Sequence, residues 1–375
     1  MFTITSLALR EIRLPLREPF RISSGVVHER RILLVELQDD DGATTWAECV
    51  ALDQPNYTAE SIDTAWYAIR EWVAPRVLGV PFETPHAVHP TLQTNFRGHP
   101  MAKAAVEMGC WAVAAQRDGV PLAQLLGGTR DRVVTGISIG IQRSPADVAA
   151  RALEARRAGY RKVKLKIQPG QDIDYVAAVR EALGPDADIM VDANAAYQLE
   201  HLEHLCELDA FGLLMIEQPL GQDDLVRHAV LQRRLRTPIC LDESITSVDR
   251  TEDMITLGAA RIVNIKPGRV GGFAVSRAIH DVCERADVPV WCGGMLESGI
   301  GRAYNVALAS LPNFTLPGDL SPSARYWERD IVSPEWTMDS SGMVGVPRDR
   351  PGIGVDVDVD RVENLTVRRE TLSAK

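Results

Sequence analysis

The chain has 375 residues, 45% hydrophobic and 25% charged, which is the composition of a globular protein large enough for more than one domain. Its formal net charge of −10 at pH 7 gives no electrostatic support for nucleic-acid binding. Because the sequence shows neither a membrane-spanning apolar run nor a signal-peptide pattern at its N-terminus, we expect a cytoplasmic protein without a membrane partner.

The first 126 residues predict an α+β domain. Residues 1–40 have the pattern of strands, and Asp41-Gly42 between two apolar runs is typical of a hairpin turn. Two polar stretches, 18–30 and 51–61, interrupt the strand pattern. We expect surface loops at both, with lids over a site as the alternative. The rest of this region, from residue 58 onward, has helical apolar spacing with Gly and Pro at the ends.

A strand–loop–helix unit repeats between residues 127 and 319. Short apolar runs alternate with helical patterns, and Ser144 followed by Pro145 marks a helix start. Such repetition predicts a parallel sheet closed into a barrel. We expect eight strands, near residues 132–139, 161–167, 188–192, 212–217, 238–242, 261–266, 289–293 and 313–317. Residues 320–375 lose the alternation and are expected to pack back on the N-terminal domain.

Three carboxylates mark the ends of consecutive strands in this barrel. Asp192, Glu217 and Asp242 each end an apolar run, and they are spaced 25 residues apart. Because the carboxyl ends of barrel strands face one site, we expect the three side chains to converge. One such acid alone is more often a helix cap, but three at one barrel end repel each other unless a cation neutralises them. The pattern therefore predicts Mg²⁺, with Mn²⁺ or Co²⁺ as substitutes.

Lysines flank the three acids. Lys164 and Lys166 share one face of the second predicted strand, and Lys266 ends the sixth, on the other side of the barrel. A lone lysine is usually solvated, but burial and a nearby cation disfavour its ammonium form and bring it toward useful basicity. Bases on two faces of a carbon acid suit racemisation, or elimination with one lysine idle as a base. We therefore predict an enzyme that removes a proton α to a carboxylate of a small-molecule substrate, with these three lysines as catalytic residues.

These motifs resemble the enolase superfamily, within its muconate-lactonising subgroup, and that superfamily uses a Lys or His base with Mg²⁺. The two lysines of the second strand, the three acids and Lys266 match the subgroup's motifs, whereas the mandelate-racemase branch would carry a His–Asp pair. The resemblance covers nearly the whole chain. It implies an α/β fold with a modified TIM barrel, (β/α)7β, at residues 127–319. It also implies an α+β capping domain built from residues 1–126 and the tail 320–375.

Three segments, LREPFR, IKPGRVGG and CGGMLESGIGRAYNVALASLPNFTLPGD, resemble more closely the o-succinylbenzoate synthases that also act as N-succinylamino-acid (N-acylamino-acid) racemases. This resemblance implies the dehydration that gives o-succinylbenzoate, the racemisation, or both. It also implies substrate contacts at Ser138, Asn194, Gly293, Gly294, Met295 and Tyr57. From sequence alone, Ser138 is as readily a strand hydroxyl bonded to backbone, and Asn194 a turn residue. Arg269 goes with the racemase branch of that family and is expected to modulate Lys266.

Two other functions stay open. A dipeptide epimerase or a muconate cycloisomerase would run the same half-reaction on another substrate, but epimerases of this superfamily usually carry Asp-x-Asp at the eighth strand, where this chain has PGDLSPS. A catalytically inactive barrel that serves as a binding protein is the alternative of a different class, and the complete set of lysines and acids argues against it. The preferred acyl group stays open as well, because the loop SSGVVHERR has a composition of its own. We expect a homo-oligomer.

Overall fold

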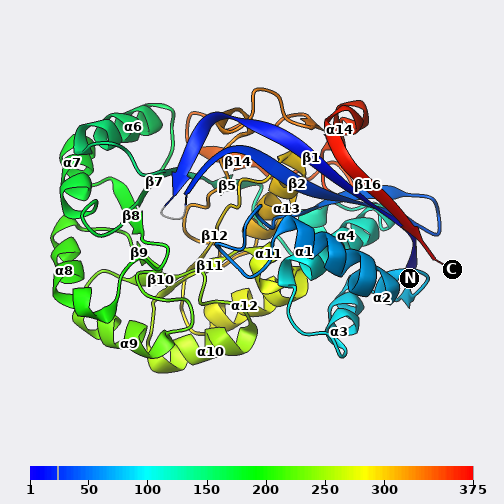
Figure 1. Cartoon of the computed structure of the whole chain (residues 1–375), viewed down its shortest axis with the longest axis horizontal. Helices are drawn as coiled ribbons and strands as arrows, with labels where there is room; N and C mark the ends of the chain where they lie inside the picture. The colour runs from blue at the N-terminus through cyan, green and yellow to red at the C-terminus, as the bar shows by residue number, and fades with distance from the viewer. Residues whose placement is uncertain (23–24, 375) are drawn as a thin grey trace.

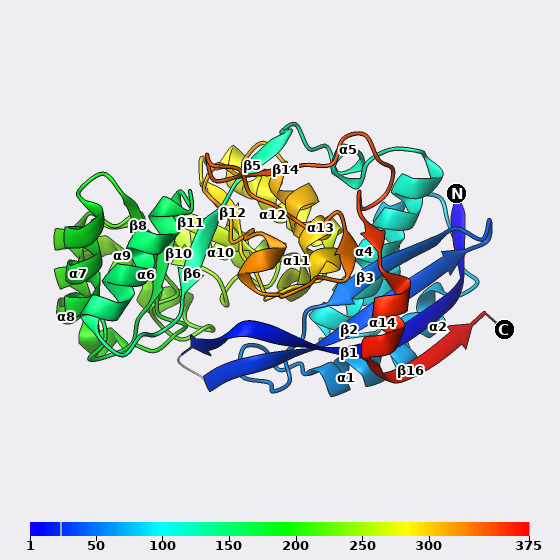
Figure 2. The ribbon, with the colours of Figure 1, turned by 90° about the horizontal axis from the view of Figure 1, so that it is seen from above.

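A seven-stranded parallel sheet curls into a half-barrel, and a layer of antiparallel strands and helices lies beside it (Figure 1). The computed structural model describes residues 1–22 and 25–374. Seen from above, β1 and β2 form a long ribbon that reaches from this layer toward the barrel (Figure 2). The predicted fold class, a modified barrel with an N-terminal cap, is confirmed.

The antiparallel sheet combines the two ends of the chain. Its strand order is β16-β1-β2-β3, and a short fifth strand pairs with β1. The hairpin at Asp41-Gly42 is confirmed: Leu37 pairs with Thr45 across it, and Gly42 has a φ of +82°, where glycine is favoured. The strands are β1 (Phe2–Ile22), β2 (Gly25–Asp39), β3 (Thr44–Cys49), β4 (Pro81–Phe82) and β16 (Thr366–Ser373).

The polar stretch 18–30 is not the loop that its composition predicts. β1 and β2 continue through it, with Phe20 opposite Val27 and Ile22 opposite Gly25, after a register shift between Pro15 and Phe20. The backbone of a two-stranded ribbon pairs whatever side chains it carries, and a ribbon outside the core needs no apolar alternation. The polar composition of residues 18–30 therefore gave no indication that the strands continue there. Residues 23 and 24, which also belong to this predicted loop, lie outside the described residues.

Helices of the N-terminal part pack against the antiparallel sheet. The central one, α4, is buried from Met101 to Ala115 and packs on β3 and β2. Gly109 allows this close approach, because a Cβ at that position would lie 2.5 Å from Leu37. The helices of this region are α1 (Ile62–Ala68), α2 (Ala74–Val77), α3 (Val88–Gln93), α4 (Pro100–Arg117) and α5 (Leu122–Leu125), with a π-helical turn at Ile69–Val73. Residues 51–61 form the loop that the sequence predicts.

Seven of the eight predicted barrel strands are present and parallel, in the order β12-β11-β10-β9-β8-β7-β6. They are β6 (Gly136–Ile139), β7 (Lys162–Lys166), β8 (Asp188–Asp192), β9 (Ile216–Glu217), β10 (Ile239–Leu241), β11 (Ile262–Ile265) and β12 (Val290–Cys292). The first predicted strand is split, because β5 (Arg132–Val134) pairs instead with β14 (Met343–Gly345) of the C-terminal tail.

The eighth predicted strand, 313–317, is wrong as a strand. This stretch contains a turn and a bend, and the residues after it make isolated backbone bonds to the two outer strands of the sheet or next to them, from Asp319 N to Cys292 O at 2.8 Å on one side and from Gly136 N to Gly318 O at 2.7 Å on the other. Gly318 forms a single parallel bridge with Thr135. The Pro and Gly residues of LPGD supply few donors and little strand propensity, so no continuous ladder forms there.

Helices surround the barrel, as Figure 1 shows for α6 to α10 on its outer side. The helix start at Ser144 is confirmed, since its side chain accepts from Asp147 N. The helices are α6 (Pro145–Arg157), α7 (Ile173–Leu183), α8 (Leu202–Glu207), α9 (Leu225–Arg234), α10 (Val248–Leu257), α11 (Pro267–Val270), α12 (Phe273–Arg285) and α13 (Gly299–Ala309). No helix among the described residues has the length and apolar character needed to cross a membrane.

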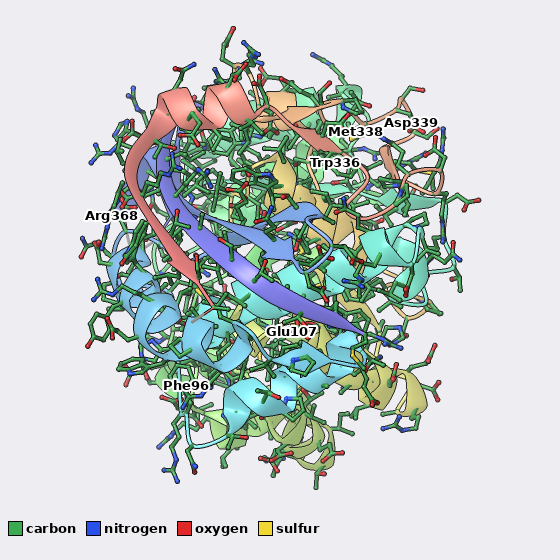
Figure 3. All side chains as sticks on the ribbon, turned by 90° about the vertical axis from the view of Figure 1, so that its right-hand side faces the viewer. Phe96, Glu107, Trp336, Met338, Asp339 and Arg368 are labelled. Carbon is green, nitrogen blue, oxygen red and sulfur yellow. The ribbon has the colours of Figure 1, made fainter. Side chains whose placement is uncertain are left out.

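The C-terminal tail returns to the N-terminal sheet. It contains β13 (Val332–Ser333), β14, β15 (Asp356–Val357), α14 (Val359–Leu365) and β16. Figure 3 shows β16, with Arg368, lying beside β1 at this end of the molecule. The two parts of the fold are tied together by buried acids. Glu107 on α4 (labelled in Figure 3) accepts from Phe273 N at 2.7 Å, where α12 begins, and Glu48 on β3 accepts from Gly301 N at 3.1 Å on α13.

Candidate active site

The register of the parallel sheet brings the predicted acids and lysines to one end of the barrel. Lys166 stands opposite Asp192 on the neighbouring strand, and Asp192 stands opposite Glu217 on the next. Asp242 follows β10 directly, and Lys266 follows β11. All six side chains are buried or nearly so. Strands β8, β9 and β10, whose ends carry the acids, separate the lysines of β7 from Lys266.

The two lysines of β7 contact the acids from one side. Lys166 Nζ lies 2.5 Å from Asp192 Oδ2 and donates to Asn194 Oδ1 at 2.6 Å. Lys164 Nζ lies 3.3 Å from Glu217 Oε2 and 3.5 Å from Asp192 Oδ2. These contacts make the acids and lysines of β7, β8 and β9 one buried charge network.

Lys266 meets the third acid from the other side. Its Nζ lies 2.8 Å from Asp242 Oδ2 and donates to the hydroxyl of Tyr57 at 3.1 Å. Tyr57 comes from the loop 51–61 and donates to Asp242 Oδ1 at 2.8 Å, so this loop reaches into the barrel mouth. The guanidinium of Arg269 contacts the same oxygen of Asp242 and also donates to the Tyr57 hydroxyl at 3.2 Å. Arg269 is therefore paired with a buried acid and not with a surface one.

Burial and neighbouring charge shift these groups in different directions. Burial and the charge of Asp192 raise the pKa of Glu217 well above its ordinary value. Burial acts in the same direction on Asp192, but Lys166 and Lys164 outweigh it and hold the pKa of Asp192 below its usual range. Burial opposes the Lys266 ammonium, but Asp242 and Tyr57 outweigh it and raise the pKa of Lys266. The lysines thus neutralise the negative charge of the acids incompletely, and Glu217 is the acid whose charge they balance least.

The donor set fits a hard divalent cation, because it consists of three buried carboxylates at one barrel end. The oxygens of the three acids do not all lie within 4.8 Å of one another. Among the described residues, one group of His, Cys, Asp or Glu side chains meets this spacing: His280, Asp281 and Glu284 on α12. Each of the three carboxylates contacts the ammonium group of a lysine. His280 has both ring nitrogens engaged, with Asp281 at 2.8 Å and with Asn313 N at 2.9 Å.

The residues expected to hold the substrate surround the same network. Ser138 Oγ donates to Asp319 Oδ2 at 3.1 Å, a side-chain partner in place of the backbone. Gly293 lies against the Lys266 side chain, since an added Cβ would come within 2.6 Å of Lys266 Cε. At Gly294 an added Cβ would lie 2.8 Å from Asp319 O. Met295 lines a small cavity together with Lys266. Substitution of either glycine would therefore fill space beside the site.

Four residues of the network were missed by the sequence reasoning. Asp319, in PGDLSPS, lies 2.6 Å from Lys164 Nζ, and Lys162 Nζ lies 3.6 Å from the other oxygen of Asp319 and 3.7 Å from the ring centre of Trp291. Asn264 donates to Glu217 Oε1 at 2.7 Å, and Glu243 accepts from Asn194 at 2.9 Å. Lys162 and Asn264 stand two residues before Lys164 and Lys266, so strand periodicity was a usable signal for both.

Comparisons with known proteins identify the family of this chain. Residues 147–362 match the enolase C-terminal domain-like family, and residues 4–127 match the N-terminal domain of mandelate racemase / muconate lactonizing enzymes. The chain belongs to the mandelate racemase / muconate lactonizing enzyme family of the enolase superfamily.

Two relatives of similar identity carry different activity names. The chain is 47% identical to an o-succinylbenzoate synthase of Geobacillus stearothermophilus, over 96% of this chain and 94% of the relative. It is 45% identical to an N-succinylamino acid racemase of an Amycolatopsis species, over 98% of each. A crystal structure of an enolase superfamily member from Listeria innocua has 37% identity and a TM-score of 0.96, with 100% of both chains covered.

Proposed function

We propose that this protein is a divalent-metal-dependent enzyme that removes a proton α to a carboxylate, with o-succinylbenzoate synthase and N-succinylamino-acid racemase activity. The proposal rests on the placement of Lys166 and Lys266 on opposite sides of three carboxylates at one end of the barrel. The names of the relatives, at 45–47% identity over nearly the whole chain, support the same two reactions.

Asp192, Glu217 and Asp242 would hold Mg²⁺, with Mn²⁺ or Co²⁺ as substitutes. When bound, the cation supplies positive charge to the substrate carboxylate and so lowers the cost of removing the neighbouring proton. Asn194 supports this part of the site, because its backbone N–H donates to Asp192 Oδ1 at 3.0 Å.

The lysines carry the proton transfers. In racemisation Lys166 takes the α-proton of one enantiomer and Lys266 returns a proton to the other face, and the roles reverse for the opposite enantiomer. In the dehydration Lys166 takes the proton and returns it to the departing hydroxyl, while Lys266 stays protonated. Lys164 remains cationic beside Glu217 and Asp319 and stabilises negative charge on the substrate.

The substrate would enter beside the β1–β2 ribbon. A cavity of about 1070 Å³ lies between this ribbon and β6 and α6. Its wall includes Phe20, His28 and Gln168, and Gln168 follows Lys166 by two residues in the sequence. Tyr57 would cover the opposite side of the site, over Lys266. Ser138 and the turn at Gly293, Gly294 and Met295 would hold the succinyl or acyl end.

The dipeptide epimerase alternative is weaker. Asp319 is already paired with Lys164 and Ser138, and the position two residues later is Ser321, so no free carboxylate is offered there to a substrate ammonium group. We also infer that residues 1–126 with 320–375 form the capping domain, that 127–319 form the catalytic barrel, and that the protein is a cytoplasmic homo-oligomer without nucleic-acid partners.

The test is a direct assay of the Mg²⁺-loaded full chain. We expect conversion of the o-succinylbenzoate precursor and racemisation of an N-succinylamino acid, both with kcat/KM above the values for dipeptides and for muconate. If neither succinyl substrate reacts while a dipeptide epimerises, the substrate assignment is wrong and only the half-reaction stands.

A further inference from the structure

A fourth acid, Glu243, lies immediately after Asp242 and has no part in the function proposed above. Its side chain is buried, with 8% of the residue exposed. Its Oε1 accepts from Asn194 Nδ2 at 2.9 Å, and its Oε2 has no hydrogen-bond partner among residues 1–22 and 25–374. A buried, half-satisfied carboxylate beside Asp192 and Asp242 is costly. Its presence therefore needs a reason.

Glu243 ends a chain of hydrogen bonds that begins at Lys166. Lys166 Nζ donates to Asn194 Oδ1 at 2.6 Å, and Asn194 Nδ2 donates to Glu243 Oε1. A lysine ammonium has donors only, so the amide oxygen of Asn194 must face it. The amide nitrogen then needs an acceptor, and the acceptor present is Glu243. The carboxylate thus sets which way the amide is turned.

The backbone around Asn194 is held in an uncommon conformation that presents this amide. Asn194 has a φ of +42° and Ala195 one of +61°, two consecutive non-glycine residues in the left-handed region. This conformation is disfavoured for residues that carry a Cβ. Backbone bonds from Asn194 N to Asp192 Oδ1 at 3.0 Å and from Ala195 N to Gln218 O at 2.8 Å hold the turn. Strain maintained at this point indicates that the direction of the Asn194 side chain matters.

Lys266 has a separate set of partners. Its Nζ contacts Asp242 and Tyr57, and no hydrogen bond joins it to Asn194 or Glu243 in the described part of the chain. The hydrogen-bond chain from Glu243 therefore reaches Lys166 only, whereas Glu243 and Lys266 interact through their charges alone.

We propose that Glu243 is a positioning residue for Lys166: it fixes the amide of Asn194, which in turn holds the Lys166 ammonium on its side of the substrate. This role rests on the proposed function. It implies that Glu243 supports proton transfer more strongly on the face of Lys166 than on the face of Lys266.

The experiment follows α-proton exchange in D₂O for each enantiomer of an N-succinylamino acid, with the Mg²⁺-loaded full chain. Glu243→Leu removes the acceptor and leaves the Asn194 amide free to turn its NH₂ toward Lys166. We expect exchange to fall roughly 10- to 100-fold for the enantiomer that Lys166→Ala fails to exchange, and to fall far less for the other. The remaining exchange also shows that the variant is folded.

Three further variants make the result decisive. Glu243→Gln keeps one acceptor oxygen and should recover a large part of the exchange that Glu243→Leu loses. Asn194→Ala breaks the same chain at its middle and should show the same preference for one enantiomer. Glu252→Leu, at an exposed glutamate on α10, is the matched control and should change neither enantiomer.

Equal losses for both enantiomers in Glu243→Leu and Asn194→Ala, or no loss in either variant, would overturn the positioning role. A wild-type protein that exchanges neither enantiomer gives a different result, because it would overturn the proposed function itself.

Discussion

Lys166 and Lys266 are the same chemical group in different surroundings. Lys166 lies between Asp192 and Asn194, and Lys266 lies against Asp242 with the ring of Tyr57 4.4 Å from its Nζ. Since three acid-bearing strands separate them, we expect each lysine to reach only its own face of a bound substrate.

Lys166→Ala should therefore lose α-proton exchange with one enantiomer of an N-succinylamino acid in D₂O, and Lys266→Ala with the other. The loss should be large, about 100-fold or more, because a general base is removed. The measurement is the exchange rate of each enantiomer in each variant, with substrate binding checked separately. Equal loss of both enantiomers in both variants, with substrate still bound, would count against a lysine for each face.

Arg269 and Lys266 share one acid, Asp242, and we expect Arg269 to act on Lys266 through it. It holds one oxygen of Asp242 while Lys266 holds the other, and it is itself fixed by Asn264 O at 2.6 Å and Ile245 O at 2.8 Å. An arginine on Asp242 limits the negative charge that favours the Lys266 ammonium. Lys266 must exchange a proton in racemisation but not in dehydration.

Arg269→Gln should therefore reduce kcat/KM for racemisation by about 10-fold or more while dehydration falls much less. Both values are measured in the same preparations of wild type and variant. A similar loss in the two reactions would show that Arg269 supports the site as a whole and has no particular effect on Lys266.

At the scale of elements, two buried acids join the antiparallel layer to the barrel by capping its helices. Glu107 on α4 accepts from Phe273 N, from Ala274 N and from the indole of Trp111, and burial raises its pKa to about 7. Backbone N–H groups at a helix start favour a nearby acid, so these bonds offset part of the cost of burial.

This raised pKa has a defined effect on stability. The folded state binds the Glu107 proton more tightly than the unfolded state, whose pKa is near 4.5. The contribution of Glu107 to the free energy of unfolding is therefore full below about pH 4.5 and is lost as the pH rises to about 7, by up to roughly 3 kcal/mol. Glu107→Gln should remove this part of the pH dependence. Urea unfolding of wild type and variant at pH 5 and pH 8 tests it, and identical pH slopes in the two proteins would contradict it.

The sequence predicted the features that repeat from strand to strand in the barrel, and it did not predict contacts between residues far apart in the chain. Equal spacing of Asp192, Glu217 and Asp242 predicted their convergence because successive strands end at one site. The same logic failed for the eighth strand, where isolated bonds around Gly318 replace a ladder, and so Asp319 was overlooked as a partner of Lys164. The partners of Tyr57 lie more than 180 residues away, a distance at which no local pattern gives a signal.

At the scale of the whole molecule, the barrel and the N-terminal part each contribute residues to the site. The barrel supplies the acids and lysines from the ends of β7 to β11, while the N-terminal part supplies Tyr57 and the β1–β2 ribbon at the mouth. We expect both lysines to remove α-protons only when a divalent cation is held by the three carboxylates.

The most direct measurement is α-proton exchange in D₂O for both enantiomers of an N-succinylamino acid, before and after metal removal by a chelator and after Mg²⁺ is added back. We expect exchange of both enantiomers to disappear together on chelation and to return together with Mg²⁺, and we expect Asp242→Asn to stay folded but inactive throughout. Full exchange by the metal-free protein, or by Asp242→Asn, would contradict this expectation.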